Sequence, residues 1–149
     1  WGVIPVCCLK KLIKENLFHV HQTFHDTTEI LNYLCDELID NDLATKAYKE
    51  DVFKREAVSA TSFMYGFAVP HSIEVSTKKS CISVLILDRS VKWGEFDVKF
   101  IILLGIRETD NHLLKIFFDW LSSIVANSKK FEQLLEVNNY EEFMKEIIA

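Results

Sequence analysis

The sequence has no apolar run long enough to cross a membrane. Residues 1–9 are apolar, but they are too few for a span and have no basic segment before them, as a signal peptide would have. The chain also lacks an excess of positive charge, because its formal net charge is −5 at pH 7. Nucleic-acid-binding surfaces select for Lys and Arg, so we expect no direct nucleic-acid contact by this domain.

Motifs for several kinds of chemistry are also missing. The sequence contains no G-x-S-x-G elbow, no P-loop and no G-x-G-x-x-G fingerprint. Its four cysteines form no C-x-x-C pair. We therefore expect free thiols in a reducing, cytoplasmic setting, with Cys7, Cys35 and Cys81 packed among apolar neighbours. The first residue is not methionine, and we expect that the domain was excised from a longer chain.

The composition is that of an ordinary globular protein, with 49% hydrophobic and 26% charged residues among 149. This length is enough for one domain with a single sizeable core. No repeat, low-complexity tract or linker divides the chain, so residues 1–149 are expected to form a single domain. Residues 1–25 are the hardest part to assign, and only a short strand around 17–20 is expected there.

Capping signals and helical periodicity predict five helices. The clearest start is Asp26, which has Glu29 three residues later and apolar residues at helical spacing up to Asp40. The predicted helices, each with its N-cap in parentheses, are 27–40 (Asp26), 46–55 (Thr45), a long helix after Asp110, 129–137 (Ser128) and 140–148 (Asn139).

The inner faces of two of these helices can be predicted from their apolar residues. In the second helix, Ala47, Val52 and Phe53 are expected to point inward. In the last helix, Phe143 and Ile147 are expected to do so. The remaining residues of both helices are mostly polar, which indicates that each helix covers the core with one side only.

Runs rich in β-branched residues predict strands at 67–69, 81–87 and 98–106. Residues 88–94 are expected to form a loop, and the polar residues 74–80 a surface loop. Near-continuous apolarity at 100–104 indicates that both faces of the sheet are covered. Because helices precede, interleave with and follow the strands, we expect an α/β fold, an αβα sandwich with a central mixed β-sheet flanked by helices.

The stretch from Arg55 to His71 is the most informative part of the chain. Pro70 fixes its own φ and biases Val69 toward an extended shape, so His71 is expected to be exposed where an extended segment ends. Gly66 allows a turn or a close backbone approach. A neutral imidazole is a competent nucleophile toward phosphorus, and an arginine such as Arg55 can hold a phosphoryl group through charge-assisted hydrogen bonds. On residue types alone, a surface histidine and a helix-ending arginine explain both residues at least as well.

His112 is the second histidine with a predicted function. If Asp110 caps the following helix, His112 lies in its first turn. Free N–H groups and the helix dipole favour anions there and disfavour a protonated imidazole. A neutral His112 could then donate an N–H to a phosphoryl group on His71. The alternative interpretation is a polar residue in an exposed first turn.

The remaining histidines form a His-x-His-x-x-x-His cluster of His19, His21 and His25. Imidazoles at such spacing can share a zinc or nickel ion, and His19 and His21 would lie on one face of a strand. No carboxylate or cysteine motif completes the ligand set. Surface histidines beside a strand and a turn are the preferred interpretation, and we expect no metal site.

A set of spaced residues runs from an Arg-Glu pair, through Ser and Thr, to a Gly-x-Ala-Val-Pro-His ending: Arg55, Glu56, Ser59, Thr61, Gly66, Ala68, Val69, Pro70 and His71. This set resembles the signature of the fructose/mannitol-type IIA domains of the bacterial sugar phosphotransferase system, with the same spacing from arginine to histidine. Four later segments look like the family in the same order: 82–87, 91–93, 100–104 and 112–114. The resemblance covers about residues 26–148.

The resemblance implies an α/β sandwich and a role for each candidate residue. It implies that His71 is phosphorylated by the histidine phosphocarrier protein, and that Arg55 and His112 steady the phosphoryl group. In a transporter, the phosphate then passes to a IIB domain and on to sugar. No metal or organic cofactor is needed, because the chemistry is in-line transfer between positioned nucleophiles.

Two departures from the family pattern bear on the partners. Met64 and Tyr65 stand where the family often has Gly-Asn, which reshapes the rim of the pocket. Phe63 resembles the IIA-like domains appended to transcription regulators and antiterminators, in which the phosphohistidine acts as a signal. A transport relay and a C-terminal regulatory module of a sugar-responsive regulator therefore both stay open.

Overall fold

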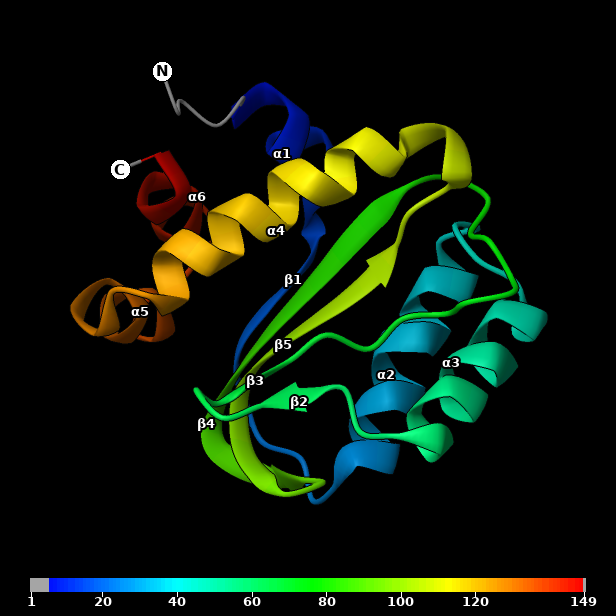
Figure 1. The fold of residues 1–149 in the computed structure, drawn as a ribbon, viewed down its shortest axis with the longest axis horizontal. Helices are drawn as coiled ribbons and strands as arrows, with labels where there is room; N and C mark the ends of the chain where they lie inside the picture. Colours follow the sequence, from blue (N-terminus) through cyan, green and yellow to red (C-terminus); the bar gives the residue numbers. More distant parts are fainter. Residues whose placement is uncertain (1–5, 149) are drawn as a thin grey trace.

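The computed structural model describes residues 6–148, and a mixed five-stranded sheet runs through the middle of the molecule (Figure 1). The strands are β1 (Ile13–Gln22), β2 (Ser62–Phe63), β3 (Phe67–Ala68), β4 (Cys81–Trp93) and β5 (Phe96–Gly105). Their order across the sheet is β1-β4-β5-β3-β2. The β1–β4 and β3–β5 pairs are parallel, and the β4–β5 and β2–β3 pairs are antiparallel.

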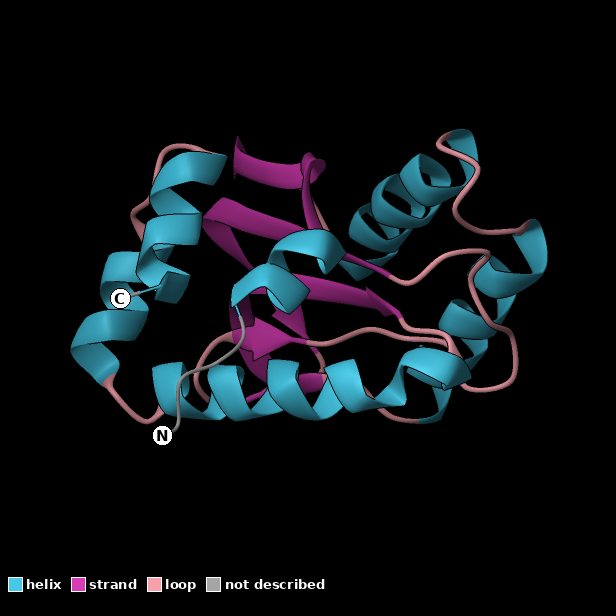
Figure 2. Ribbon diagram, turned by 90° about the horizontal axis from the view of Figure 1, so that it is seen from above, coloured by secondary structure: helices cyan, strands magenta, loops and turns pink. Residues whose placement is uncertain are grey.

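Helices cover both faces of this sheet (Figures 1 and 2). They are α1 (Val6–Leu12), α2 (Thr27–Asp40), α3 (Lys46–Val58), the short 3₁₀ helix η1 (Glu108–Asp110), α4 (Asn111–Val125), α5 (Ser128–Leu135) and α6 (Tyr140–Ile148). Apolar residues of α2 and α3 pack on one face, and those of α1, α4, α5 and α6 pack on the other. The predicted αβα sandwich is confirmed. Within the part of the chain that is described, no helix has both the length and the apolarity to span a bilayer.

Successive residues of the central strands face two different cores. Ile82 and Val84 of β4 pack on the α4 side, whereas Leu85 and Leu87 pack on the α2–α3 side. Because side chains alternate across a strand, a strand with both faces covered needs apolar residues at every position. This requirement explains the apolar runs at 84–87 of β4 and 100–104 of β5.

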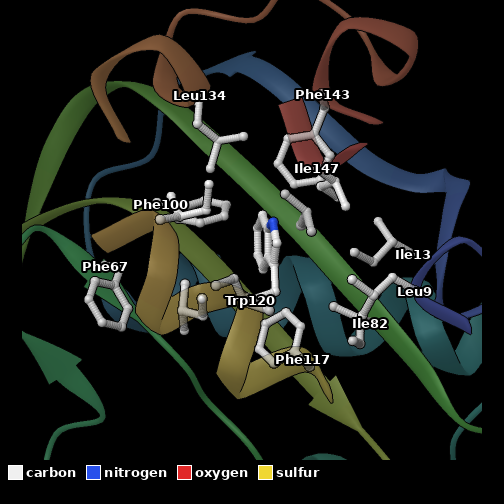
Figure 3. Close-up of a cluster of buried hydrophobic side chains, with 14 of the residues drawn as sticks. Leu9, Ile13, Phe67, Ile82, Phe100, Phe117, Trp120, Leu134, Phe143 and Ile147 are labelled. Carbon is white, nitrogen blue, oxygen red and sulfur yellow. The ribbon is translucent and has the colours of Figure 1, made fainter. Parts of the chain in front are cut away.

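The core on the α4 side is built around Trp120 (Figure 3). Its ring centroid lies 5.8 Å from that of Phe117 and 6.3 Å from that of Phe143. Each aromatic pair at such a distance contributes about 0.5–1.5 kcal/mol beyond the area it buries. Phe143 and Ile147 are buried here, as the sequence predicts.

Three helices begin with the predicted caps. The N–H of Glu29 donates to Oδ1 of Asp26 at 2.9 Å. Thr45 and Asn139 each accept the N–H three residues later, at 3.2 and 2.9 Å. Each bond pairs a donor that the first turn of a helix leaves free, so these starts could be located from the sequence.

The other two predicted caps need correction. Asn127, not Ser128, caps α5, and its Oδ1 accepts the N–H of Lys130 at 3.1 Å. Both residue types are good caps, and the helix begins one residue earlier than the prediction. Asp110 does precede α4, but its side chain makes no capping bond. Its Oδ2 accepts the hydroxyl of Ser80 at 2.5 Å instead.

The predicted loop at 88–94 is wrong, because β4 continues to Trp93 and forms a hairpin with β5. The polar residues 88–90 are exposed and lie where the pairing register shifts. Beyond them, Val91 and Trp93 are buried again. A turn at Gly94, whose φ is +66°, then reverses the chain. The short strand expected around 17–20 is likewise only part of the longer β1.

Candidate functional site

His71 lies where the extended segment after β3 ends, as its position behind Pro70 predicts. It forms a parallel bridge with Leu104 of β5, and the N–H of Leu104 donates to the Pro70 carbonyl at 3.0 Å. Nδ1 of the half-buried ring is 2.9 Å from the carbonyl oxygen of Val69. A carbonyl can only accept a hydrogen bond, so Nδ1 carries the proton. In the neutral form of the ring, the lone pair is therefore on Nε2.

A cavity of about 200 Å³ lies beside this ring. It is lined by His71, Ser72, Leu104, Ile106, Leu114 and Phe118. Leu114 and Phe118 belong to α4, so the imidazole lies between the sheet and that helix. The walls away from His71 and Ser72 are apolar. The imidazole of His71, the candidate nucleophile, thus lies at the wall of a small, largely apolar cavity.

Arg55 lies in the last turn of α3 and is half-buried. Its Nη1 donates to the carbonyl oxygen of Ser59 at 2.6 Å, which closes the C-terminal end of the helix. This hydrogen bond of Arg55 thus goes to its own chain segment and not to His71. Of the three predicted site residues, all of which the structure describes, only His71 lines the cavity.

His112 lies in the first turn of α4, where the sequence places it. Its side chain is exposed. The preceding turn is fixed by Ser80, which donates to Asp110 at 2.5 Å and accepts the N–H of Arg107 at 2.9 Å. The segment that follows His71 is therefore joined at its far end to the start of the helix that carries His112.

The predicted inner face of α3 is confirmed at Val52, which is buried, and at Phe53, which packs against the core. Ala47 is exposed, whereas Tyr48 and Asp51 are buried. The hydroxyl of Tyr48 donates to the carbonyl oxygen of Leu104 at 2.6 Å. Tyr48 and Asp51 were not predicted as site residues. The one available signal was spacing, since positions 48, 51 and 55 lie along one side of a helix.

Asp51 holds the chain that follows His71. Its Oδ2 accepts three hydrogen bonds, from the Ser72 hydroxyl at 2.5 Å and from the N–H groups of Ile73 and Glu74 at 2.8 and 2.9 Å. These bonds, above all the one from Ser72, lower the pKa of Asp51, because each stabilises the charged form. Asp51 is therefore an ionised, hydrogen-bonded anchor close to the candidate nucleophile.

Glu56, next to Arg55, holds the other end of the motif. Its Oε2 accepts the N–H of Thr61 at 2.6 Å and the indole N–H of Trp93 at 2.9 Å. Its Oε1 accepts the Thr61 hydroxyl at 2.7 Å. One carboxylate thus joins α3, the segment before β2 and the tip of the β4–β5 hairpin. The Glu and Thr of the motif have structural partners, which the sequence does not reveal.

The turn between these parts depends on Gly66. Its φ is +91°, a conformation that residues with a Cβ rarely adopt, which confirms that a turn occurs here. Its carbonyl accepts the N–H groups of Lys99 and Phe100 at 3.0 and 3.2 Å.

In the polar loop at 74–80, Thr77 is buried and donates to the Gly105 carbonyl at 3.0 Å, so this residue is an exception to the predicted surface loop.

The three clustered histidines have separate partners. Nε2 of His19 is 2.7 Å from Glu37 on α2. His21 has a φ of +56° and contacts Asp88 at 3.0 Å; this carboxylate raises the pKa of His21. His25 is exposed. Across residues 6–148, no three or more His, Cys, Asp or Glu side chains are arranged to hold a metal ion.

Two of the predicted packing cysteines are indeed buried and free, Cys35 and Cys81. Burial raises the pKa of each thiol to about 12, because the thiolate is poorly solvated there. At neutral pH both are protonated and unreactive. The side chain of Cys7 lies outside the described residues.

An apolar groove of about 500 Å³ adjoins the His71 cavity. The β2–β3 hairpin contributes Phe63, Met64 and Tyr65, and α4 contributes Phe118. The exposed fractions of Met64 and Tyr65 are 69% and 59%. Phe118 lines both the groove and the cavity. The two residues that depart from the family pattern therefore form an exposed apolar rim next to the candidate nucleophile.

Comparison with known proteins shows the family to which the chain belongs. The family model for the "Phosphoenolpyruvate-dependent sugar phosphotransferase system, EIIA 2" matches residues 11–149. A "Multiphosphoryl transfer protein" of Escherichia coli O6:H1 is 32% identical over 130 residues, which are 83% of this chain and 15% of that protein. A "Probable licABCH operon regulator" of Bacillus subtilis is 24% identical over 132 residues, 89% of this chain and 21% of that protein. The chain thus spans about a fifth or less of these relatives.

A solved structure has the same fold. The IIAMTL–phosphorylated IIBMTL complex from Escherichia coli aligns with a TM-score of 0.78, covering 91% of this chain and 98% of the matched chain. The sequence identity is 16%, so this likeness concerns the fold. It agrees with the strand order and the helix-covered sheet described above.

Proposed function

Because the chain belongs to the EIIA 2 family of the phosphoenolpyruvate-dependent sugar phosphotransferase system, we propose that His71 is its phosphoryl acceptor. The observation that supports this role most directly is the 2.9 Å contact of Nδ1 with the Val69 carbonyl, which leaves the lone pair on Nε2. A neutral imidazole with a free lone pair is the form that attacks phosphorus. The cavity beside the ring offers space for the incoming group.

The proposed reaction moves one phosphoryl group between two imidazoles. Nε2 of His71 forms a bond to phosphorus while the P–N bond of the donor phosphohistidine breaks, and the donor nitrogen keeps the electron pair. The product carries up to about two negative charges. We propose that Arg55 exchanges its bond to Ser59 for a phosphoryl oxygen, and that His112 donates an N–H from the first turn of α4. Positioned donors and nucleophiles suffice for this transfer, so no cofactor takes part.

The proposed partners are proteins on both sides of the reaction. The histidine phosphocarrier protein would be the donor, and a IIB domain the acceptor. The solved IIAMTL structure is a complex with phosphorylated IIBMTL, which supports the second assignment. The reaction would take place in the cytoplasm, a setting that suits the free thiols of Cys35 and Cys81.

The direct test is transfer from phosphoenolpyruvate. The purified chain is incubated with phosphoenolpyruvate, enzyme I and the histidine phosphocarrier protein, and the intact mass is measured under alkaline conditions that preserve phosphohistidine. We expect one added phosphoryl group, found in the peptide that contains His71. A chain that stays unlabelled, or label on a different histidine, would contradict the proposal.

A regulatory use of the same phosphohistidine is the second candidate function. The similarity to a probable operon regulator favours it. The two uses differ after labelling: a relay loses its phosphate to an added IIB domain and then to sugar, whereas a regulatory module keeps it over the same period. Following the label on the chain, on the IIB domain and in sugar phosphate distinguishes them.

We also propose that the donor protein contacts the groove beside His71, since a phosphohistidine can reach Nε2 only if its carrier packs against this surface. Truncation of both Met64 and Tyr65 to alanine is expected to raise KM for the phosphocarrier protein about 10-fold and to leave kcat unchanged, because exposed apolar anchors contribute to docking. Initial labelling rates at several donor concentrations measure both constants.

Tyr33→Ala is the control for the groove variant. Tyr33 is also an aromatic residue at the surface: it belongs to α2 and is 37% exposed. It lies on the face of the sheet opposite to α4 and the groove. We expect its KM to equal that of the wild type. An unchanged KM in the Met64/Tyr65 variant, or an equal rise in both, would show that the groove is not the docking surface.

A further inference from the structure

We propose that Asp51 is a positioning residue for His71, acting through Ser72 and the main chain that follows the histidine. This inference rests on the proposed function of His71. Asp51 does not line the cavity, so it does not touch the reacting atoms. It would set the direction in which the imidazole is presented.

The contacts concentrate on one oxygen atom. Oδ2 of Asp51 accepts bonds from each of the next three residues after His71, at 2.5 Å from the Ser72 hydroxyl, 2.8 Å from the Ile73 N–H and 2.9 Å from the Glu74 N–H. The residue is 8% exposed. Hydrogen bonds to a charged acceptor are about twice as strong as neutral ones. The chain that leaves His71 is therefore fixed to α3 at its first three positions.

The same helix also holds the strand beside His71. Tyr48, one turn before Asp51 on α3, donates to the carbonyl of Leu104 at 2.6 Å, and Leu104 is the residue that bridges to His71. Tyr48 and Asp51, two neighbouring side chains of α3, thus hydrogen-bond to β5 beside the histidine and to the chain segment that follows it. With its main chain held in this way, His71 keeps Nδ1 on the Val69 carbonyl and Nε2 free.

The arrangement also assigns a role to Ser72. Ser72 lines the cavity, and its hydroxyl would otherwise be an obvious ligand for a phosphoryl group. Its single proton is donated to Asp51, and its oxygen accepts the Val75 N–H at 3.2 Å. A hydroxyl has one donor, so the Ser72 side chain has none left for the phosphate. The phosphate donors must come from other residues, which agrees with the roles proposed for Arg55 and His112.

Asp51→Ala and Asp51→Asn test the inference. The alanine variant loses the acceptor, and we expect kcat for phosphoryl transfer to His71 to fall about 10-fold or more with KM for the phosphocarrier protein unchanged, because small misplacements of a nucleophile slow the reaction strongly. The asparagine variant keeps an oxygen acceptor and is expected to recover part of this loss. The ¹⁵N chemical shifts of the His71 ring are expected to report one tautomer in the wild type and a mixture in Asp51→Ala.

The control is Ser83→Ala, which removes another buried hydrogen bond, the one to the Leu17 carbonyl at 3.1 Å. We expect its labelling kinetics to match the wild type even if its melting temperature falls. If both folded Asp51 variants label with wild-type kcat, or if the alanine variant changes KM alone, Asp51 is not a positioning residue.

The two proposals can fail separately. If the wild-type chain takes no phosphate at all, the proposed function fails. In that case the ring shifts still decide the positioning role, because they need no donor protein. A single tautomer retained in Asp51→Ala would overturn it.

Discussion

His71→Gln is expected to take up less than about 1% of the phosphate that the wild type accepts, because glutamine has no nucleophilic nitrogen. Glutamine keeps an N–H donor and a comparable length, so the segment between Pro70 and Ser72 should keep its path. The measurement is the intact mass of the chain after incubation with phosphoenolpyruvate, enzyme I and the phosphocarrier protein. Circular dichroism verifies that the variant is folded.

Two other histidine variants make this result specific. His25 is exposed and does not line the cavity, so His25→Gln should label fully. His112→Gln should label more slowly but still reach completion, because His112 is proposed to stabilise the phosphoryl group and not to receive it. Wild-type labelling of His71→Gln would refute His71 as the acceptor. If His112→Gln also stayed unlabelled, His112 would be the acceptor and His71 the stabilising residue.

Glu56→Ala is expected to lower the free energy of unfolding by about 3 kcal/mol, the largest stability change that we predict for a polar residue. The reason is that three donors lose one shared acceptor: the N–H and hydroxyl of Thr61 and the indole of Trp93. In a protein of this size the loss corresponds to a fall in melting temperature of roughly 6–12 °C. Thermal and urea unfolding followed by circular dichroism measure it.

Glu50→Ala is the matched control for this prediction. Glu50 is an exposed residue of the same helix, so its replacement has the same effect on helix propensity without removing the hydrogen bonds to Thr61 and Trp93. We expect a change within about 0.5 kcal/mol. Equal losses in the two variants would mean that the Glu56 bonds contribute nothing to stability.

Much of the fold could be predicted because its signals are local. The caps at Asp26, Thr45 and Asn139 are bonds between residues three apart, and the two central strands contain apolar runs at 84–87 and 100–104. The continuation of β4 could not be predicted, because residues 88–90 are polar and the strand persists only through its pairing with β5. Such pairing depends on tertiary context, which overrides the local preference.

In the candidate site, too, the residues marked by local features could be predicted and those held by distant partners could not. His71 and His112 could be located from Pro70 and from the start of α4, which are local features. Asp51 could not be identified, because its three donors are 21–23 residues away along the chain. The polar inner face of α3 misled the prediction for the same reason. Its residues are buried because distant partners satisfy them, and apolar periodicity cannot detect such burial.

The strand order has a consequence for how the protein acquires activity during folding. The β4–β5 and β2–β3 hairpins pair strands that are joined by short turns, whereas Ile13 pairs with Ile82 and Phe67 with Phe100. Local pairings form early and distant ones must first close long loops. His71 needs β3, β5, α3 and α4 in place, so the acceptor role proposed for it requires a chain that is almost completely folded. Partly folded chains emerging from synthesis would then accept no phosphate.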